Sequence, residues 1–145
     1  MSDPIFFKKS MDDMIMKARK YKPTAIAGID SRGFLFASII AYKLKIKLII
    51  IRKKGKLPGK VFRSTYKLEY GSNTLEIQKD FLSSKDKVLL VDDIFATGGT
   101  LNASCNLVKQ TKSQVVGALV LVELLFLSGR KNFKFKLESL EKTNT

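Results

Sequence analysis

The segment VLLVDDIFATGGTLNAS, which runs from Val88 to Ser104, joins a buried-strand pattern to a helical pattern through two acids and a glycine-rich turn. Its first four residues are branched and apolar, as is typical of a strand covered on both faces. Asp92 and Asp93 follow, and the turn then carries two threonines and two glycines. Because ligands bind beyond the carboxyl ends of the strands in open parallel sheets, we expect a ligand site at this corner.

The residue types of the turn indicate a site for a ribose phosphate. Glycines let the backbone approach a ligand closely, and free amides at a helix N-terminus together with two hydroxyls form a socket for one phosphate. The two carboxylates would repel that phosphate, so they are better placed on sugar hydroxyls or on Mg²⁺ that the ligand brings. The turn lacks the lysine of a Walker loop and the GxGxxG spacing of a dinucleotide fingerprint. The expected contacts to ribose and 5′-phosphate are Asp92, Asp93, Ala96, Thr97, Gly98, Gly99 and Thr100.

Alternating helix and strand patterns predict an α/β fold with a mostly parallel central sheet flanked by helices. The expected strands are 24–29, 48–51, 88–91 and 115–125, and the expected helices are one that starts at residues 3–4 and two at 33–44 and 100–109. Residues 55–78 interrupt the alternation and predict a flexible hairpin, or flap, over the ligand edge. We see no linker and predict one domain over residues 1–145, whose polar end, Glu138 to Thr145, is expected to fray.

The composition excludes several classes of chemistry. The chain has no histidine, which removes the commonest general base and the commonest metal ligand. Its one cysteine, Cys105, cannot form an internal disulfide and is interpreted as a core residue, which suits a reducing, cytoplasmic location. No apolar run reaches the roughly 18 residues that a membrane helix needs, so we expect no membrane partner.

The formal net charge of +14 is unevenly distributed, since residues 31–68 contain no acidic residue. One interpretation is a lysine-rich, solvated surface. The other is a positive field that attracts a phosphate-rich ligand or a nucleic acid.

The opening segment resembles the phosphoribosyl-diphosphate motif of the type I phosphoribosyltransferases, which has four apolar residues, two acids and a TGGT-type loop. Further blocks resemble consecutive parts of the adenine phosphoribosyltransferase family: IAGIDSRGFLFA (26–37), IRKKGKLPGKV (51–61), YKLEYGSNTLEIQKD (66–80) and LVELLFLSGRKNF (121–133). The resemblance runs in register from about Asp3 to Phe133. It implies the type I phosphoribosyltransferase fold and the conversion of adenine and phosphoribosyl diphosphate into AMP and pyrophosphate, with Mg²⁺.

The resemblance also implies roles for individual residues. It assigns a pyrophosphate loop, in which family members often have a cis peptide, and two diphosphate-binding lysines: Asp30, Ser31, Arg32, Gly33, Lys53 and Lys56. The catalytic candidates are Glu69, whose carboxylate is expected to assist proton transfer at the adenine ring, and Arg52, at a position that contacts the diphosphate. Tyr70 belongs with Glu69 to a mobile loop. The family forms homodimers, which we expect here through residues 26–44, and we expect no specific nucleic-acid partner.

The resemblance begins later than the family pattern does. In the family, a strand and a loop that form a hood over the adenine precede the segment that matches Asp3. We therefore expect a complete ribosyl-phosphate half of the site and a base half that is only partly represented in these residues. Two hypotheses stay open: a working adenine phosphoribosyltransferase that is slow with adenine, or a non-catalytic paralogue or regulator that binds phosphoribosyl diphosphate or AMP.

Overall fold

The computed structural model describes residues 2–145, which form a seven-stranded sheet and three α-helices. The helices are α1 (Pro4–Lys20), α2 (Gly33–Leu44) and α3 (Gly99–Gln110), with two 3₁₀ turns, η1 (Leu125–Leu127) and η2 (Gly129–Asn132). The strands are β1 (Ala25–Ile29), β2 (Lys47–Lys53), β3 (Val61–Lys67), β4 (Ser72–Gln78), β5 (Lys87–Phe95), β6 (Gln114–Leu124) and β7 (Leu137–Thr143). None of these helices is long and apolar enough to cross a membrane.

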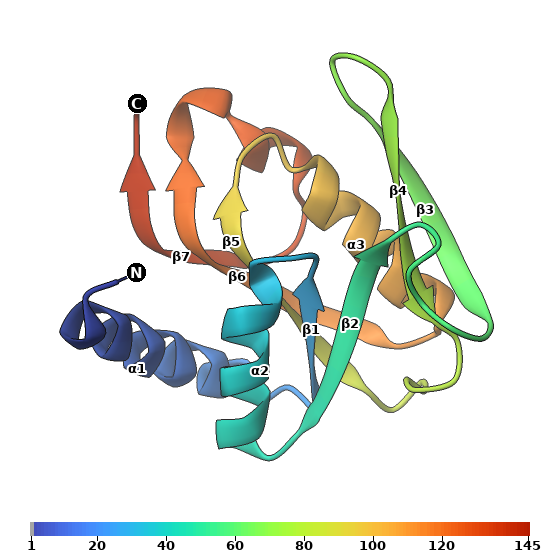
Figure 1. Ribbon diagram of the computed structural model, residues 1–145, viewed down its shortest axis with the longest axis horizontal. Helices are drawn as coiled ribbons and strands as arrows, with labels where there is room; N and C mark the ends of the chain where they lie inside the picture. The colour runs from blue at the N-terminus through green and yellow to red at the C-terminus, as the bar shows by residue number, and fades with distance from the viewer. Residues whose placement is uncertain (1) are drawn as a thin grey trace.

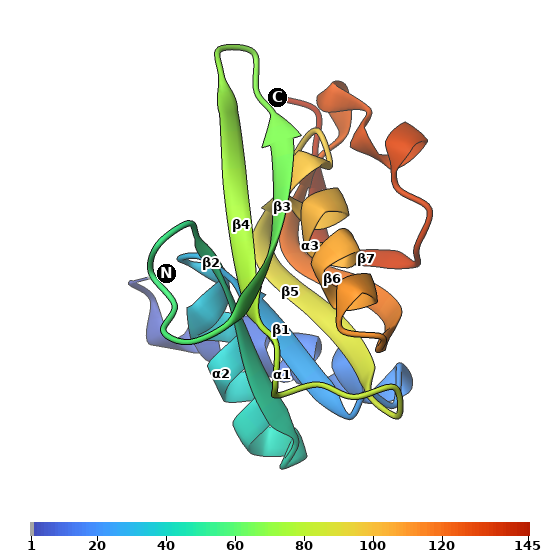
Figure 2. The same ribbon diagram turned by 90° about the vertical axis from the view of Figure 1, so that its right-hand side faces the viewer.

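The strand order of the sheet is β3-β4-β2-β1-β5-β6-β7 (Figure 1). The strands from β2 to β7 in this order run parallel, whereas β4 pairs antiparallel with both β2 and β3. The prediction of a mostly parallel sheet flanked by helices is therefore confirmed. The insert at 55–78 contains the predicted hairpin, β3–β4, which adds two strands to the sheet beside β2. Its tip projects beyond the ends of the central strands (Figure 2).

The helices cover the two faces of the sheet through separate apolar layers. On one face, α1 and α2 pack against β1, β5 and β6 through residues that include Ile26, Leu89 and Val91. On the other face, α3 packs against residues that include Val88 and Leu90. Consecutive residues of β5 thus enter opposite layers, as the alternation of side chains along a strand requires. This explains why the residues of β5 from Val88 to Val91 are all apolar, and Figure 2 shows α2 and α3 on opposite sides of the sheet.

The expectation that Glu138 to Thr145 fray is wrong, because most of these residues belong to β7, which pairs in parallel with β6. Glu138 accepts a hydrogen bond from the hydroxyl of Tyr21 at 2.9 Å, and its other oxygen lies 3.3 Å from Nζ of Lys17. Leu137 is buried at the start of the strand. Charged residues are common on edge strands, where they prevent pairing with other chains. A composition typical of a polar tail therefore also fits the last strand of this sheet.

An ion pair between a buried glutamate and an exposed arginine fixes the turn after β6. Glu123 is 2% exposed and accepts hydrogen bonds from Nε and Nη2 of Arg130, at 2.7 and 2.8 Å. This bidentate contact closes the segment that contains η1 and η2 back onto β6. The hydrogen bond from Arg130, together with the nearby charge of Lys142, holds the pKa of the Glu123 carboxyl below its usual value. The ionised carboxylate therefore stabilises the fold.

This pair predicts a pH-dependent stability difference. We expect Glu123→Gln to lower the free energy of unfolding at pH 7 by about 1–3 kcal/mol, the scale of a lost hydrogen bond to a charged group. Because the folded-state pKa of Glu123 is lowered, its contribution is present above the unfolded-state value of about 4.3 and is lost as the pH falls through the folded-state value. Denaturant titrations of the wild type and the variant at pH 7 and between pH 5 and 3 measure this.

The matched control is Glu141→Gln, which removes an exposed carboxylate from the neighbouring strand β7. It should change stability by less than about 0.5 kcal/mol. A Glu123→Gln deficit that stays constant down to pH 3 would contradict the assignment of an ionised, stabilising Glu123.

Candidate functional site

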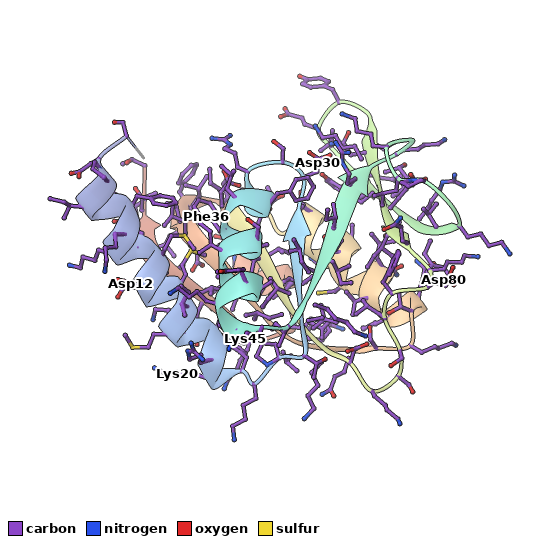
Figure 3. The ribbon with its side chains drawn as sticks, turned by 60° about the horizontal axis from the view of Figure 1, so that its bottom comes forward. Asp12, Lys20, Asp30, Phe36, Lys45 and Asp80 are labelled. Atoms are coloured by element: carbon purple, nitrogen blue, oxygen red, sulfur yellow. The ribbon has the colours of Figure 1, made fainter. Side chains whose placement is uncertain are left out.

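The carboxyl ends of the parallel strands gather the predicted polar residues at one edge of the sheet. Asp30 follows β1, Arg52 lies near the end of β2, and Asp92 and Asp93 lie near the end of β5. The parallel register of β1 with β2 and with β5 places these strand ends side by side. Figure 3 shows Asp30 and Lys45 at opposite ends of α2.

The turn between β5 and α3 has the features predicted for a phosphate socket. Gly98 has a φ of 94°, in the left-handed region, and stands at the N-cap of α3, where no side chain caps the helix. Residues 94–101 line a small cavity of about 70 Å³. Amides at an uncapped helix N-terminus favour an anion through their partial positive charge. The turn can therefore accept a phosphate on its backbone N–H groups and on the hydroxyls of Thr97 and Thr100.

The acid pair lies beside this turn in two different environments. Asp92 is 9% exposed and its Oδ1 accepts a hydrogen bond from the amide of Asp93 at 2.8 Å. Asp93 is less buried, and its Oδ2 lies 3.2 Å from Nε of Arg32. Burial, with the added effect of the Asp93 carboxylate, raises the pKa of Asp92 to about 8. A group that shares hydrogen bonds with Asp92 therefore meets a carboxyl that can act as a donor or as an acceptor near neutral pH.

The predicted pyrophosphate loop connects β1 to α2 and meets the end of β2. The peptide bond between Asp30 and Ser31 is cis, as the resemblance implies. Oδ2 of Asp30 accepts a hydrogen bond from the amide of Lys53 at 3.3 Å and lies 3.5 Å from Nε of Arg52. The latter contact lacks hydrogen-bond geometry, so the buried Nε of Arg52 has no partner among the described residues. The guanidinium stands 5.9 Å from the centre of the Phe34 ring.

The remaining predicted residues lie on exposed segments and are not brought into contact with the socket. Glu69 and Tyr70 are at the tip of the β3–β4 hairpin, where Tyr70 is 88% exposed. Lys53 is exposed at the end of β2, and Lys56 is exposed in the loop between β2 and β3. The hairpin itself is anchored at its base, where the buried carboxylate of Glu76 pairs with Arg63 and accepts a hydrogen bond from the amide of residue 55.

The basic span at 31–68 does not form one patch. Arg32, Arg52 and Lys53 lie at the ligand edge, whereas Lys45 lies at the opposite end of α2 and Nζ of Lys47 pairs with Asp86 at 2.8 Å. The span therefore divides into cations that face the candidate site and cations that do not.

Sequence reasoning missed an exposed apolar surface next to the socket. It consists of Ile94 at the end of β5 and Leu125, Phe126 and Leu127 in η1, with exposures from 36% to 53%. The turn that carries η1 and η2 packs closely on the socket, and Nδ2 of Asn102 donates a hydrogen bond to the carbonyl of Asn132 at 3.0 Å. The signal in the sequence is that residues 115–127 are apolar except for Gly117 and Glu123, so the apolar pattern continues past the strand.

The described residues contain no group of three or more His, Cys, Asp or Glu side chains that could hold a metal ion by themselves. Two adjacent carboxylates are sufficient for a divalent ion that arrives with its own phosphate ligands. Cys105 is buried in α3, as predicted, and burial raises the pKa of its thiol to about 12. The thiol therefore stays protonated and is not a nucleophile.

Comparisons with known proteins agree with this geometry. Residues 6–138 match the Phosphoribosyl transferase domain family. The adenine phosphoribosyltransferase of Rhodospirillum rubrum is 42% identical over 140 residues, which cover 97% of this chain and 82% of that protein. The crystal structure of adenine phosphoribosyltransferase from Rhodothermus marinus superposes with a TM-score of 0.91 at 34% identity, covering 97% of this chain and 81% of that one.

A further solved structure is the adenine phosphoribosyltransferase of Saccharomyces cerevisiae in complex with adenine and an imino-altritol bisphosphate. It is 37% identical, has a TM-score of 0.88, and covers 95% of this chain and 81% of that one. The sequence identity, the coverage and the shared fold lead to one conclusion. The chain belongs to the adenine phosphoribosyltransferase family.

Proposed function

We infer that the chain is an enzyme that transfers the phosphoribosyl group from phosphoribosyl diphosphate to adenine, with AMP and pyrophosphate as products. The observation that carries this inference is the meeting of an uncapped glycine turn, an acid pair and an exposed apolar surface at one edge of the sheet. Backbone amides suit a phosphate, carboxylates suit ribose hydroxyls, and apolar side chains suit a purine ring. Adenine bound to the Saccharomyces relative supports the same substrate class.

We assign the 5′-phosphate to the turn and the ribose to the acid pair. The left-handed Gly98 keeps the backbone bare, so that phosphate oxygens can reach the amides of residues 98–100. Ala96 and Thr97 complete the turn on the strand side. Asp92 and Asp93 lie in β5, before the turn, where they can accept hydrogen bonds from the two ribose hydroxyls without facing the charge of the phosphate.

We assign the diphosphate to the cations of the pyrophosphate loop and of β2. Arg32, Arg52 and Lys53 stand at the same edge, and the partly exposed guanidinium of Arg52 can donate hydrogen bonds to an anion. Ser31 and Gly33 flank Arg32, Asp30 orients the end of β2, and Lys56 approaches from the exposed loop. Mg²⁺ held by the diphosphate would neutralise negative charge on the leaving group. Asp92 and Asp93 are the carboxylates available to that ion.

We assign the adenine to the surface formed by Ile94 and η1, with the hairpin tip as its cover. The transferred ribosyl group passes through an oxocarbenium-like state: the bond from C1′ to the diphosphate oxygen breaks, and a bond from C1′ to a ring nitrogen forms. Cations at Arg32 and Arg52 stabilise the departing diphosphate, which is the main electrostatic requirement. Glu69 accepts or relays the proton that the adenine ring gives up, because no histidine is available for this task.

We further propose a homodimer that forms through the outer face of α2 and β2. Leu35 and Tyr42 on α2 are 61% and 82% exposed, and Leu48 and Ile50 on β2 are also exposed. Exposed apolar side chains on two neighbouring elements favour association with a second chain. Sedimentation velocity should give twice the mass of one chain for the wild type and a shift towards one chain for Leu35→Asp. A monomeric wild type would contradict the dimer.

A cytoplasmic location is part of the same proposal, because the buried Cys105 stays protonated and unpaired. Cell fractionation that finds the protein outside the cytoplasm would contradict it.

The activity itself has a direct test. Steady-state formation of AMP from adenine, phosphoribosyl diphosphate and Mg²⁺ should occur with the wild type, and Glu69→Gln should lower kcat by about 10²-fold or more, the scale of a lost general acid or base. The matched control is Asp80→Asn, an exposed carboxylate just beyond the other end of the hairpin, which should leave kcat unchanged (Figure 3). Binding of phosphoribosyl diphosphate without any formation of AMP would contradict the enzyme and support a non-catalytic binder instead.

The phosphate assignment has a separate test. Gly98→Val adds a side chain at a left-handed position on the ligand-facing turn and should weaken AMP binding at least about tenfold in calorimetry. Gly59→Val is the control, because Gly59 has a similar φ of 76° with open space around it, in a loop away from the socket. Equal AMP affinity of the wild type and Gly98→Val would overturn the assignment.

A further inference from the structure

Tyr66 joins the hairpin to the phosphate socket. It lies in β3, partly buried against the core layer between the sheet and α3. Its hydroxyl is 3.0 Å from Oγ1 of Thr100, which belongs to the predicted socket. Its ring rests on Gly99: a Cβ at that position would lie 2.9 Å from Cδ2 of Tyr66, so only glycine allows this approach. The hairpin therefore contacts the socket through both a hydrogen bond and a packed ring.

A third residue favours one of the two possible directions of this hydrogen bond, in which either hydroxyl can be the donor. Asn73 is directly opposite Tyr66 in the register of β3 and β4, and its Nδ2 donates to the Tyr66 hydroxyl at 3.4 Å. A phenol that accepts from Asn73 has its single hydrogen available for Oγ1 of Thr100. A threonine hydroxyl that accepts from Tyr66 then has its own hydrogen available for a further acceptor. In this arrangement the chain of hydrogen bonds from Asn73 through Tyr66 ends at the Thr100 hydroxyl, on the turn proposed for the phosphate.

The contact also fixes where the hairpin stands. At the other end of α3, Nε2 of Gln110 donates to the carbonyl of Arg63 at 3.0 Å, so β3 is tied to this helix at two points. Figure 2 shows β3 running alongside α3. Glu69 follows Tyr66 by three residues. Because an extended chain rises only about 3.3 Å per residue, the position of the anchored Tyr66 limits where the hairpin tip can lie relative to the site.

We propose that Tyr66 is a positioning residue that orients the Thr100 hydroxyl as a donor to the 5′-phosphate and thereby couples occupancy of the socket to the placement of the hairpin. This inference rests on the proposed function, since it takes the turn at 97–100 as the phosphate site. A phosphate that accepts a hydrogen bond from the Thr100 hydroxyl favours the state in which that hydroxyl accepts a hydrogen bond from Tyr66. Because binding couplings are reciprocal, a hairpin held by Tyr66 raises the affinity for the phosphate by the same factor.

The test is a double-mutant cycle on AMP binding. Tyr66→Phe keeps the ring on Gly99 and removes only the hydroxyl, so the chain should still fold, with a thermal midpoint lowered by no more than the loss of its two hydrogen bonds allows. In calorimetry, the Kd for AMP should rise about 3- to 10-fold, which is the scale of one hydrogen bond. In a Thr100→Val background the same substitution should have no further effect, because the hydroxyl through which Tyr66 acts is absent. Simple loss of structure would not produce this non-additivity.

The matched control is Thr65→Val, which removes the neighbouring hydroxyl pair between Thr65 and Thr74, 2.8 Å apart, on the opposite face of the hairpin. Its Kd for AMP should equal that of the wild type. Additive effects of Tyr66→Phe and Thr100→Val, or unchanged affinity in Tyr66→Phe, would overturn the role of Tyr66 while leaving the phosphate site standing. A wild type that binds neither AMP nor ribose 5-phosphate would instead overturn the proposed function and this inference with it.

Discussion

The parallel pairing of β5 with β1 on one side and β6 on the other determines where every part of the site lies. Val91 pairs with Gly28 of β1 and Asp92 with Val120 of β6, so three strands reach the same edge together. From β1 comes the loop that carries Arg32, which contacts Asp93. On the β6 side is the turn with η1 and η2, which the pair of the buried Glu123 and Arg130 holds against the strand. A shift of this register by one residue would turn each side chain to the other face of the sheet and separate these groups.

The electrostatic design follows from burial at this edge. Asp92 lies in the sheet with the raised pKa that burial imposes, whereas Asp93 is balanced by Arg32. Two carboxylates so close together cannot both be fully charged at low cost in a poorly solvated place. Ligand hydroxyls, or a cation carried by the ligand, relieve that cost, so the acid pair favours a polyol or a metal complex over a free phosphate. The amides of the adjoining turn favour a phosphate instead, so a sugar phosphate can bind this edge in one defined orientation.

Much of this arrangement is predictable from the sequence because it depends on local patterns. The apolar run at 88–91, the acids and the glycine turn identify a strand, its end and a helix start, and these elements lie where the patterns indicate. The polar strand β7 was not predictable, because its order depends on backbone pairing with β6 and on contacts from α1. The contact between Tyr66 and Thr100 joins residues 34 positions apart, and no periodicity encodes it. The apolar surface at Ile94 and η1 appears only once the turn after β6 folds back beside β5.

The central claim is that the turn at residues 96–100 receives a phosphate while the two acids receive the sugar. A crystal structure of the protein with AMP bound tests this most directly. The account predicts phosphate oxygens within about 3.2 Å of the amides of residues 98–100, ribose hydroxyls on Asp92 and Asp93, and the adenine against Ile94 and η1. A structure in which the phosphate binds at Lys53 and Lys56, with AMP absent from the turn, would contradict it.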